Sequence, residues 1–375
     1  MIFKQVLFIA AGLGLAAWVL ADEPKKRHGV ITEGEEVVQV EGGFTFTAQY
    51  SSDTRVKGEI LTSFDLVAKI PNGVGQWTAY IEGNLSPRQN GVSTLVGEAN
   101  ADAGTALDHD GKGRLQVSEI HYTRAFGENS MTVGLLRPSC VLDASEVAND
   151  ETAQFLSGSF VNNPTIAFPD YALGACLHLE QGQTGPGMNL LLSSSHGLAD
   201  NPNASYSELL DVSADGKGVF AGAELYWQTA HGMWRLGVWQ STADAAYLDG
   251  SATMDHNFGM YLTTDQALGA SKLNLRVGMA NDKVSEAAGF IGLALETQLA
   301  GNTLGIGVAQ TVVSDNAGPG QDDTRQAEVY LQMALADDLR ITPSLQWIEN
   351  SGFDNTATVY DKSLLVYGIR ASYLF

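Results

Sequence analysis

The stretch 365–375 reads LVYGIRASYLF and alternates regularly between two faces. One face carries Leu365, Tyr367, Ile369, Ala371, Tyr373 and Phe375. The other face carries Val366, Gly368, Arg370, Ser372 and Leu374. A period of two is typical of a β-strand whose two faces meet different surroundings. We therefore expect this stretch to be a strand with one strongly apolar face.

The same alternation recurs along the chain. Between residues 273 and 279, for example, apolar side chains alternate with Asn274, Arg276 and Gly278. Collecting such segments predicts about 16 strands, at 44–50, 58–70, 76–85, 114–126, 130–137, 171–181, 187–194, 218–229, 232–242, 256–264, 271–281, 288–299, 302–313, 325–336, 338–348 and 362–375.

The connections between these strands alternate in length. Those after even-numbered strands are tight, as at 230–231 and 301–302. Most of the others are longer: 86–113, 138–170, 195–217, 243–255, 314–324 and 349–361. Outer-membrane barrels have short periplasmic turns and long external loops, and strands cross hydrocarbon only as a closed barrel. The predicted fold class is an all-β, transmembrane antiparallel β-barrel.

The composition excludes several other classes. The chain has 375 residues, with 43 acidic against 21 basic side chains and a formal charge of −22. That charge argues against a nucleic-acid partner, which needs a basic surface. A hydrophobic fraction of 44% is too high for an acidic disordered chain. A mean hydropathy of −0.04 is too low for a bundle of membrane helices.

The N-terminal segment 1–21 has the features of a cleaved secretory signal. Lys4 precedes an uncharged, largely apolar run at 6–20, and Ala21 supplies a small residue for cleavage. The run is short for a membrane helix, which needs about 20 apolar residues. We expect 22–43 to be a short periplasmic segment and 44–375 to be the barrel, in the cell outer membrane.

The C-terminal residues bear on assembly, and the two cysteines bear on redox state. Tyr373 and Phe375 match the pattern of an outer-membrane targeting and assembly signal, so we expect contact with the assembly machinery. Cys176 falls inside a predicted strand and Cys140 just beyond the end of the neighbouring one, which offsets them by several residues, whereas a disulfide needs Cα atoms within about 7 Å. We expect two isolated buried thiols.

Several sequence blocks carry a family resemblance. They are ANDETAQFL at 148–156, FVNNPTIAFP at 160–169, YALG at 171–174, GMYL at 259–262 followed by Asp265 and Gln266, TPSLQWI at 342–348, and the segment from Gly368 to Phe375. Together they resemble the carbohydrate-selective porin family of Gram-negative outer membranes. The stretch 349–352 lacks a proline expected there, which weakens the match of one loop.

The resemblance implies a 16-stranded barrel through which sugars diffuse passively, with the third external loop folded into the lumen. The residues agree, because 138–170 is the longest connection and long loops are usually functional or disordered. We expect a helical stretch near 144–156. Burial inside the barrel mouth would account for the loop's apolar residues Phe155, Leu156, Phe160, Ile166 and Phe168. An external lid is the alternative.

Selectivity in such a channel comes from pore width, hydrogen-bonding groups and charge. Strand parity predicts these lumen-facing residues: Asp65, Lys69, Glu82, Glu119, His121, Glu224, Tyr226, Arg235, Trp239, Arg276 and Arg370. We expect the constriction to contain Arg137, Asn149, Asp150 and Glu151, opposed by Glu119, Arg235 or Arg276, with Trp239 and Arg370 as further substrate contacts. An alternative is that these charges form ion pairs that merely keep the pore wet.

A calcium loop is a weaker prediction. Asp108, Asp110 and Glu119 have the spacing of EF-hand ligands, but Lys112 occupies a ligand position. The residues that follow alternate as a strand rather than a helix. The alternative is an acidic hairpin loop in the second external connection, and no metal is expected.

Catalysis is not predicted. The chain contains neither HExxH nor GxSxG, so we expect no enzyme activity and no cofactor. A plugged, purely structural or adhesive barrel is disfavoured, because Gly, Thr, Gln and charged residues occupy the inner parity. The predicted function is passive outer-membrane diffusion of neutral sugars. The alternative is a general, cation-preferring diffusion porin.

The remaining expected partners follow from this location. They are outer-membrane lipid and lipopolysaccharide. Porins are often trimers, so a homotrimer is an open expectation, although no strand carries an interface signature. Many acids are assigned to the external loops, where they would repel anions within about a Debye length and leave neutral sugars almost unaffected.

Overall fold

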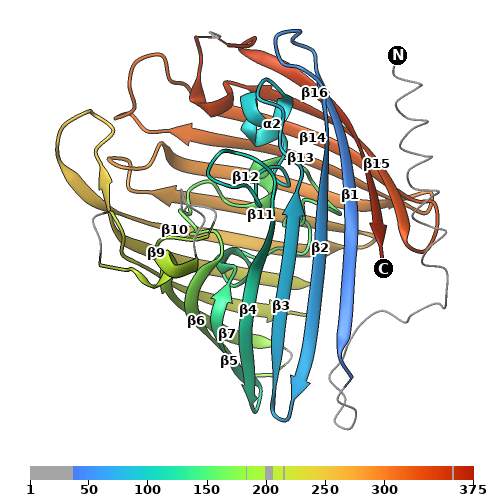
Figure 1. The fold of residues 1–375 in the computed structure, drawn as a ribbon, viewed down its shortest axis with the longest axis vertical. Coiled ribbons are helices and arrows are strands. Elements are labelled where there is room, and N and C mark those ends of the chain that lie inside the picture. The colour runs from blue at the N-terminus through green and yellow to red at the C-terminus, as the bar shows by residue number, and fades with distance from the viewer. Residues whose placement is uncertain (1–36, 183, 199–205, 214–215, 357–358) are drawn as a thin grey trace. The chain divides into compact units, whose positions relative to one another are not determined.

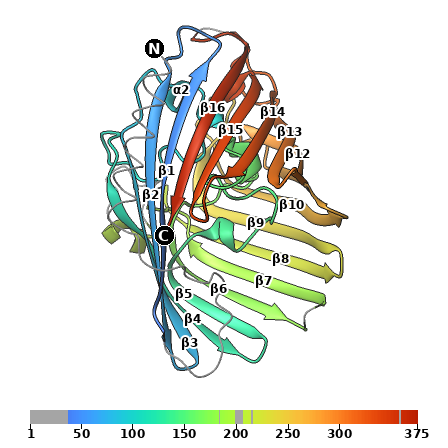
Figure 2. The same ribbon diagram turned by 90° about the vertical axis from the view of Figure 1, so that its right-hand side faces the viewer.

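A closed antiparallel barrel forms the body of the protein. The computed structural model describes residues 37–182, 184–198, 206–213, 216–356 and 359–375, so the expected signal segment 1–21 lies outside it. In the described part, each strand pairs with its neighbours in sequence, and β1 closes the ring against β16. Figure 1 and Figure 2 show β1 and β16 side by side. The predicted fold class is confirmed.

The described strands number 16. They are β1 (Gln39–Ser51), β2 (Glu59–Asn72), β3 (Gly75–Asn84), β4 (Leu115–Phe126), β5 (Asn129–Leu136), β6 (Ala172–Glu180), β7 (Gly185–Ser194), β8 (Val219–Thr229), β9 (Gly232–Ala246), β10 (Met254–Leu268), β11 (Ser271–Ala280), β12 (Ala287–Leu299), β13 (Asn302–Val313), β14 (Thr324–Ala334), β15 (Leu339–Glu349) and β16 (Ser363–Leu374).

The first strand begins earlier than expected. β1 starts at Gln39, so residues 39–43, assigned above to a periplasmic segment, belong to the barrel. At the seam, the backbone N–H of Gly42 donates to Phe375 O at 3.0 Å, and Phe375 N–H donates to Gly42 O at 2.9 Å. A Cβ on Gly42 would lie 2.7 Å from the Phe375 ring, so glycine leaves room for that ring.

The two faces of the strands differ as parity predicts. On β8 and β9 the outward residues Leu225, Trp227 and Trp234 are exposed, and the two tryptophans are paired across the strands. The alternate residues Glu224 and Arg235 are buried inside the barrel. Such an apolar outer band flanked by aromatics is typical of membrane barrels. Within the described residues, no helix is long and apolar enough to cross a membrane.

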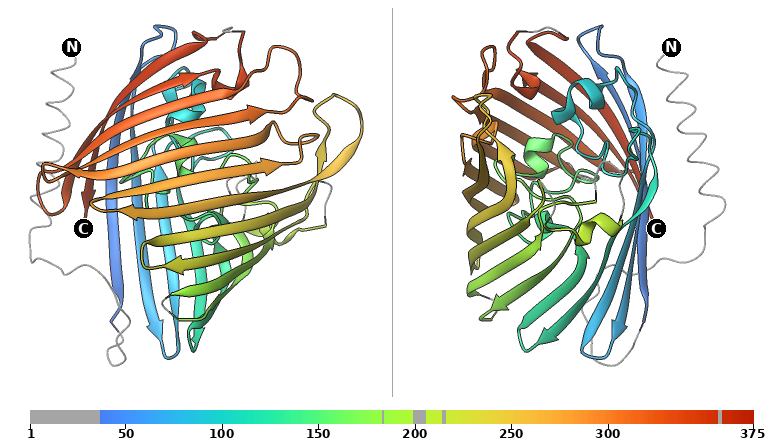
Figure 3. Two further views of the ribbon diagram at one scale, coloured as in Figure 1. Left: turned by 180° about the vertical axis from the view of Figure 1, so that it is seen from behind. Right: turned by 60° about the vertical axis from the view of Figure 1, so that its left-hand side comes forward.

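The described helices are short and lie in the connections. They are α2 (Val92–Leu95), α3 (Gly158–Val161) and the 3₁₀ turns η1 (Gly97–Ala99), η2 (Pro138–Cys140), η3 (Tyr206–Leu210) and η4 (Ser351–Phe353). Figure 3 shows α2 (cyan) and α3 (green) inside the ring of strands. The helix expected near 144–156 is wrong, because Asp150 Oδ1 accepts the N–H groups of Thr152 and Ala153 and forms a local turn instead.

Candidate channel constriction

The connection 137–171 enters the barrel and packs against its inner wall. The ring of Phe155 lies 4.8 Å from that of Phe160 and 4.9 Å from that of Tyr330 on β14, edge-on to the latter. Phe155, Leu156 and Phe160 are buried. Because Tyr330 faces inward, these contacts place the loop in the lumen rather than flat across the outside.

Arg276 on β11 binds this loop. Its Nη1 donates to Phe160 O at 2.8 Å, and its Nη2 donates to Asp143 O at 2.8 Å and Asn149 Oδ1 at 3.0 Å. Its Nε lies 3.2 Å from the Asp143 carboxylate. The Arg276 side chain is only 2% exposed. Arg276 therefore holds the loop and does not project into open water.

Two other arginines are buried on the same side of the barrel, one bonded to the loop and one paired with a neighbouring strand. Arg370 on β16 donates from Nη1 to Glu151 O at 2.6 Å and from Nη2 to Gln154 O at 2.7 Å. Arg235 on β9 lies 2.9 Å from Asp265 on β10. Both arginines are buried. Their charge is used inside the packed interface between the loop and the wall.

Carboxylates on two further strands of this side accept N–H groups of the loop. Glu328 on β14 accepts Leu156 N–H at 3.0 Å and Ser157 N–H at 2.8 Å. Glu224 on β8 accepts Asp143 N–H at 2.8 Å. A loop inside a barrel must have its backbone groups satisfied, and these side chains do so. We call the inner face of β8–β16 the anchoring wall.

A second external connection, 85–114, also folds inward, although only the third was expected to do so. Gln49 on β1 and Gln346 on β15 both donate to Ala99 O, at 2.9 and 3.0 Å. Ala101 N–H donates to Leu156 O at 2.8 Å, so the two connections touch. Asp102 accepts the Ser63 hydroxyl of β2 at 2.7 Å.

The opposite side of the barrel carries charges that keep some exposed surface. We call the inner face of β2–β4, with Arg137 at the end of β5, the open wall. The Arg137 Cζ lies 6.0 Å from the Tyr80 ring centroid, and its Nε lies 3.9 Å from Glu119. Tyr80 OH donates to Asp65 at 2.5 Å. The Arg137 side chain is 33% exposed, against 2% for Arg276.

Acidic residues of the loop face the open wall. Asp65 lies close enough to Arg137 and Asp150 to interact electrostatically, and Glu151 likewise interacts with Arg137, Asp150 and Asp65. Burial, together with the Asp150 charge, raises the pKa of Glu151 to about 7, against the opposing effect of Arg137. Burial and the Glu151 charge raise the pKa of Asp102 to about 8.

The expected constriction residues therefore separate into two groups. Four gather between the loop and the open wall: Arg137, Asp150, Glu151 and Glu119. Five belong to the packing on the anchoring wall: Asn149, Arg235, Trp239, Arg276 and Arg370. Trp239, for example, is buried and stacks on Phe220 at 5.8 Å.

Three residues between the loop and the open wall were not expected at the constriction. Tyr80 orients Arg137, Asp102 comes from the second inward-folded connection, and Cys140 is exposed beside Arg137. The expectation of two buried thiols is thus wrong for Cys140, although Cys176 is buried and both are free. The signal for the second loop was present, because Val92 and other apolar residues of 85–114 need burial just as those of 138–170 do.

The calcium candidates do not come together. Asp108 Oδ1 accepts the N–H groups of Asp110 and Lys112, both at 2.9 Å, and Lys112 Nζ lies 3.2 Å from the Asp110 carboxylate. Glu119 instead contacts His121 and Arg137 on the open wall. Among the described residues, no group of three or more His, Cys, Asp or Glu side chains is placed to hold a metal.

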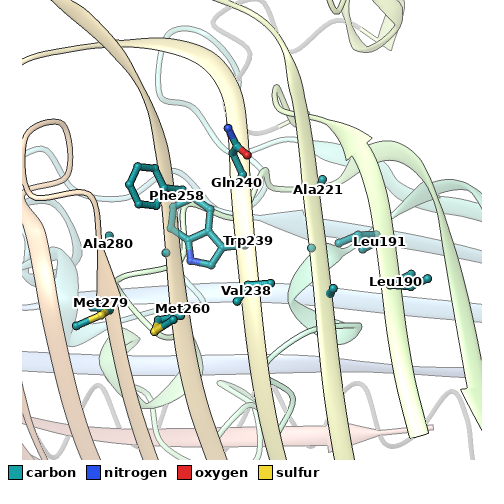
Figure 4. A pocket seen from close by; sticks show the side chains of 13 residues that line it. Leu190, Leu191, Ala221, Val238, Trp239, Gln240, Phe258, Met260, Met279 and Ala280 are labelled. Atoms are coloured by element: carbon teal, nitrogen blue, oxygen red, sulfur yellow. The ribbon is translucent and has the colours of Figure 1, made fainter.

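A separate apolar pocket of about 720 Å³ lies at β7–β11 (Figure 4). Its lining includes the outward-facing, exposed residues Val238, Met260 and Met279, with small residues such as Ala221 and Gly259 between them. Val238, Met260 and Met279 belong to the lipid-facing parity, whereas Leu191 and Trp239, which also line the pocket, are buried on the opposite parity. None of the residues that line the pocket is charged.

Comparisons with known proteins agree with this geometry. A family model described as "Carbohydrate-selective porin, OprB family" matches residues 63–371. A structure of Pseudomonas putida OprB superposes with a TM-score of 0.73 at 14% identity, covering 90% of this chain and 94% of that one. A triple mutant of Rhodopseudomonas blastica porin gives 0.52 at 13% identity, covering 90% and 100%. Comparison with curated protein sequences finds no match.

Proposed function

The chain belongs to the carbohydrate-selective porin (OprB) family, and from that premise we propose which residues form the narrowest part of its channel. The protein is an outer-membrane porin for passive diffusion of carbohydrates. The proposed constriction lies between Asp150 and Glu151 of the loop and Asp65, Glu119 and Arg137 of the open wall. The observation that carries this proposal is that Arg137 stays 33% exposed while the anchoring arginines are buried.

These groups suit a sugar. A sugar hydroxyl both donates and accepts hydrogen bonds, so a site with guanidinium donors and carboxylate acceptors can exchange bonds with it as it passes. Contact with Tyr80 and Glu119 limits the freedom of Arg137, so less entropy is lost when it binds. Weak, replaceable contacts allow the solute to leave again, which a channel requires.

Cys140 offers a direct test. Its thiol is exposed and adjacent to Arg137, whereas Cys176 is buried and serves as an internal control. We expect a bulky thiosulfonate reagent added to the reconstituted porin to reduce single-channel conductance and glucose flux. The Cys140→Ser variant should be insensitive to the reagent. Full labelling of Cys140 with unchanged glucose flux would show that the narrowest point lies elsewhere.

A general, cation-preferring diffusion porin is the second candidate. The acids Asp65, Asp150 and Glu151 favour it, because they lie close together at the proposed constriction. Reversal potentials in a salt gradient, measured with and without glucose in the same bilayer, separate the two candidates. A general porin would show cation preference without block of the current by glucose.

Assembly features form the rest of the proposal. We infer that segment 1–21 is removed on export, which the mass of the mature protein tests. Tyr373 and Phe375 act as the assembly signal, and replacing Phe375 with serine should lower the amount of protein in the outer membrane. Neutral sugars, lipopolysaccharide and the assembly machinery are the expected partners. Native mass spectrometry distinguishes a homotrimer from a monomer.

A further inference from the structure

The placement of charge in the lumen bears on which sugars pass most readily. The arginines of the anchoring wall are neutralised locally: Arg235 pairs with Asp265, and Arg276 pairs with Asp143. Arg370 binds loop carbonyl oxygens and is buried. Arg235 and Arg276 are therefore unavailable to balance other acids in the lumen, whereas Arg370 lies near enough to Asp150 to interact with it electrostatically.

Acids at the proposed constriction outnumber the two arginines beside them. Asp150 is exposed, while Glu151, Asp65 and Glu119 are half-buried. Arg137 interacts with Glu119 and with Glu151, and Arg370 interacts with Asp150, so two guanidinium groups face four carboxylates. These acids come from separate segments, β2, β4 and the loop, which the fold brings to one point on the sugar pathway.

A pathway lined by one sign of charge changes the local concentration of charged solutes. Low-dielectric walls focus the field of such groups, so a cation is enriched and an anion depleted near them. A neutral sugar gains only hydrogen bonds there. A sugar that carries an ammonium group gains the same hydrogen bonds and also the electrostatic attraction.

We propose that the channel passes sugars bearing a protonated amine faster than neutral sugars of similar size, and sugars bearing a carboxylate slowest. This inference rests on the proposed function, since it assumes that sugars pass between Asp150, Glu151 and the open wall. It assigns a substrate class, the cationic amino sugars and amino polyols, to the same constriction. We expect a cation-to-anion permeation ratio of roughly tenfold at low salt, the lower end of the enrichment that charged clefts produce.

The test uses the mature porin in proteoliposomes at pH 8. The probes are N-methylglucamine, sorbitol and gluconate, three open-chain polyols built on a six-carbon backbone that differ mainly in charge, and glucose is measured in parallel. We expect efflux to fall in that order and the ratio to shrink at high salt, because screening weakens the attraction. The double variant Asp150→Asn, Glu151→Gln should bring the three rates together, and its neutral side chains leave the backbone bond between Glu151 and Arg370 available.

Asp249→Asn is the matched control, because Asp249 caps its own external turn through Ser251. It should leave the ratio unchanged. Equal rates for the three polyols in the wild-type porin would overturn the inference while glucose still passes. A ratio that survives the double variant would also overturn it. Failure of glucose itself to pass would instead refute the proposed function.

Discussion

The anchoring wall and the open wall both carry arginines, but these arginines have different contacts. The Arg276 side chain is 2% exposed and donates hydrogen bonds to three groups of the loop. The Arg137 side chain is 33% exposed, and its Nε lies 3.9 Å from the Glu119 carboxylate. Both arginines belong to the lumen side of the barrel. The difference shows that a charged residue covered by the loop holds that loop, whereas an uncovered one keeps exposed surface, where we propose that it contacts the solute.

Breaking the anchor should have the largest effect. Replacing Arg276 with methionine leaves the Asp143 carboxylate buried without its partner, and removing one member of a buried pair costs about 3–5 kcal/mol. We expect the loop to detach, single-channel conductance to rise and the thermal unfolding temperature to fall. Adding Asp143→Asn to the same chain should recover part of the stability. Unchanged conductance in the single variant would contradict the assignment of Arg276 to the anchor.

Removing the exposed arginine should act on transport and leave the fold intact. In Arg137→Ala we expect wild-type thermal stability, because the group is partly solvated and its ion pair is long. Glucose flux at low concentration should fall about fivefold, the value of one hydrogen bond of about 1 kcal/mol. Arg137→Lys should recover the charge but not the planar fork of donors. A large loss of stability would place Arg137 with the anchoring residues instead.

A smaller effect should appear with pH. The pKa of Glu151 is raised to about 7, so its carboxyl is mostly neutral at pH 6 and mostly charged at pH 8. Facing it are Asp65 of β2, Asp102 of connection 85–114, and Arg137, Cys140 and Asp150 of its own connection. Cation preference, measured as a reversal potential, should therefore increase by about twofold from pH 6 to pH 8, as one more charge is added to the site.

Glu151→Gln should remove most of this dependence on pH. Asp102 has a raised pKa of about 8, so a residual change above pH 7 is expected in that variant. Adding Asp102→Asn to that variant then measures how much of the residual change in reversal potential comes from Asp102. A wild-type reversal potential that stays flat between pH 6 and pH 8 would exclude Glu151 as a charge at the constriction.

Strand parity predicted the barrel and the inward direction of its charged side chains. It did not predict which of these side chains the loop covers. Alternation is local, so residues such as Glu224 and Arg276 could be assigned to the lumen from their own strands. Their contacts with Asp143 depend on a loop more than 80 positions away in sequence, which no local pattern encodes. The predicted helix at 144–156 failed for a local reason, since the side chains of Ser145, Asp150 and Gln154 accept several of the segment's N–H groups.

The inward fold of connection 85–114 was not predicted, although the apolar residues of this connection indicate burial. Val92, Val96 and Ala99 are fully buried in an apolar cluster with Ile348 and Leu364. Burial inside the barrel was expected for the apolar residues of the longest loop alone. The apolar residues of 85–114 predict the same burial, and with it the approach of Asp102 to the acids of the proposed constriction.

The seam at Gly42 and Phe375 has a consequence for how the barrel forms. β1 and β16 lie at opposite ends of the barrel sequence, so their pairing is the contact with the greatest loop-closure cost. Until they meet, both strands are open edges that can pair with other chains. Closure of the ring is therefore the step that separates a correctly folding chain from an aggregating one. Because Gly42 has no side chain, the Phe375 ring can pack against the β1 backbone when the two strands pair.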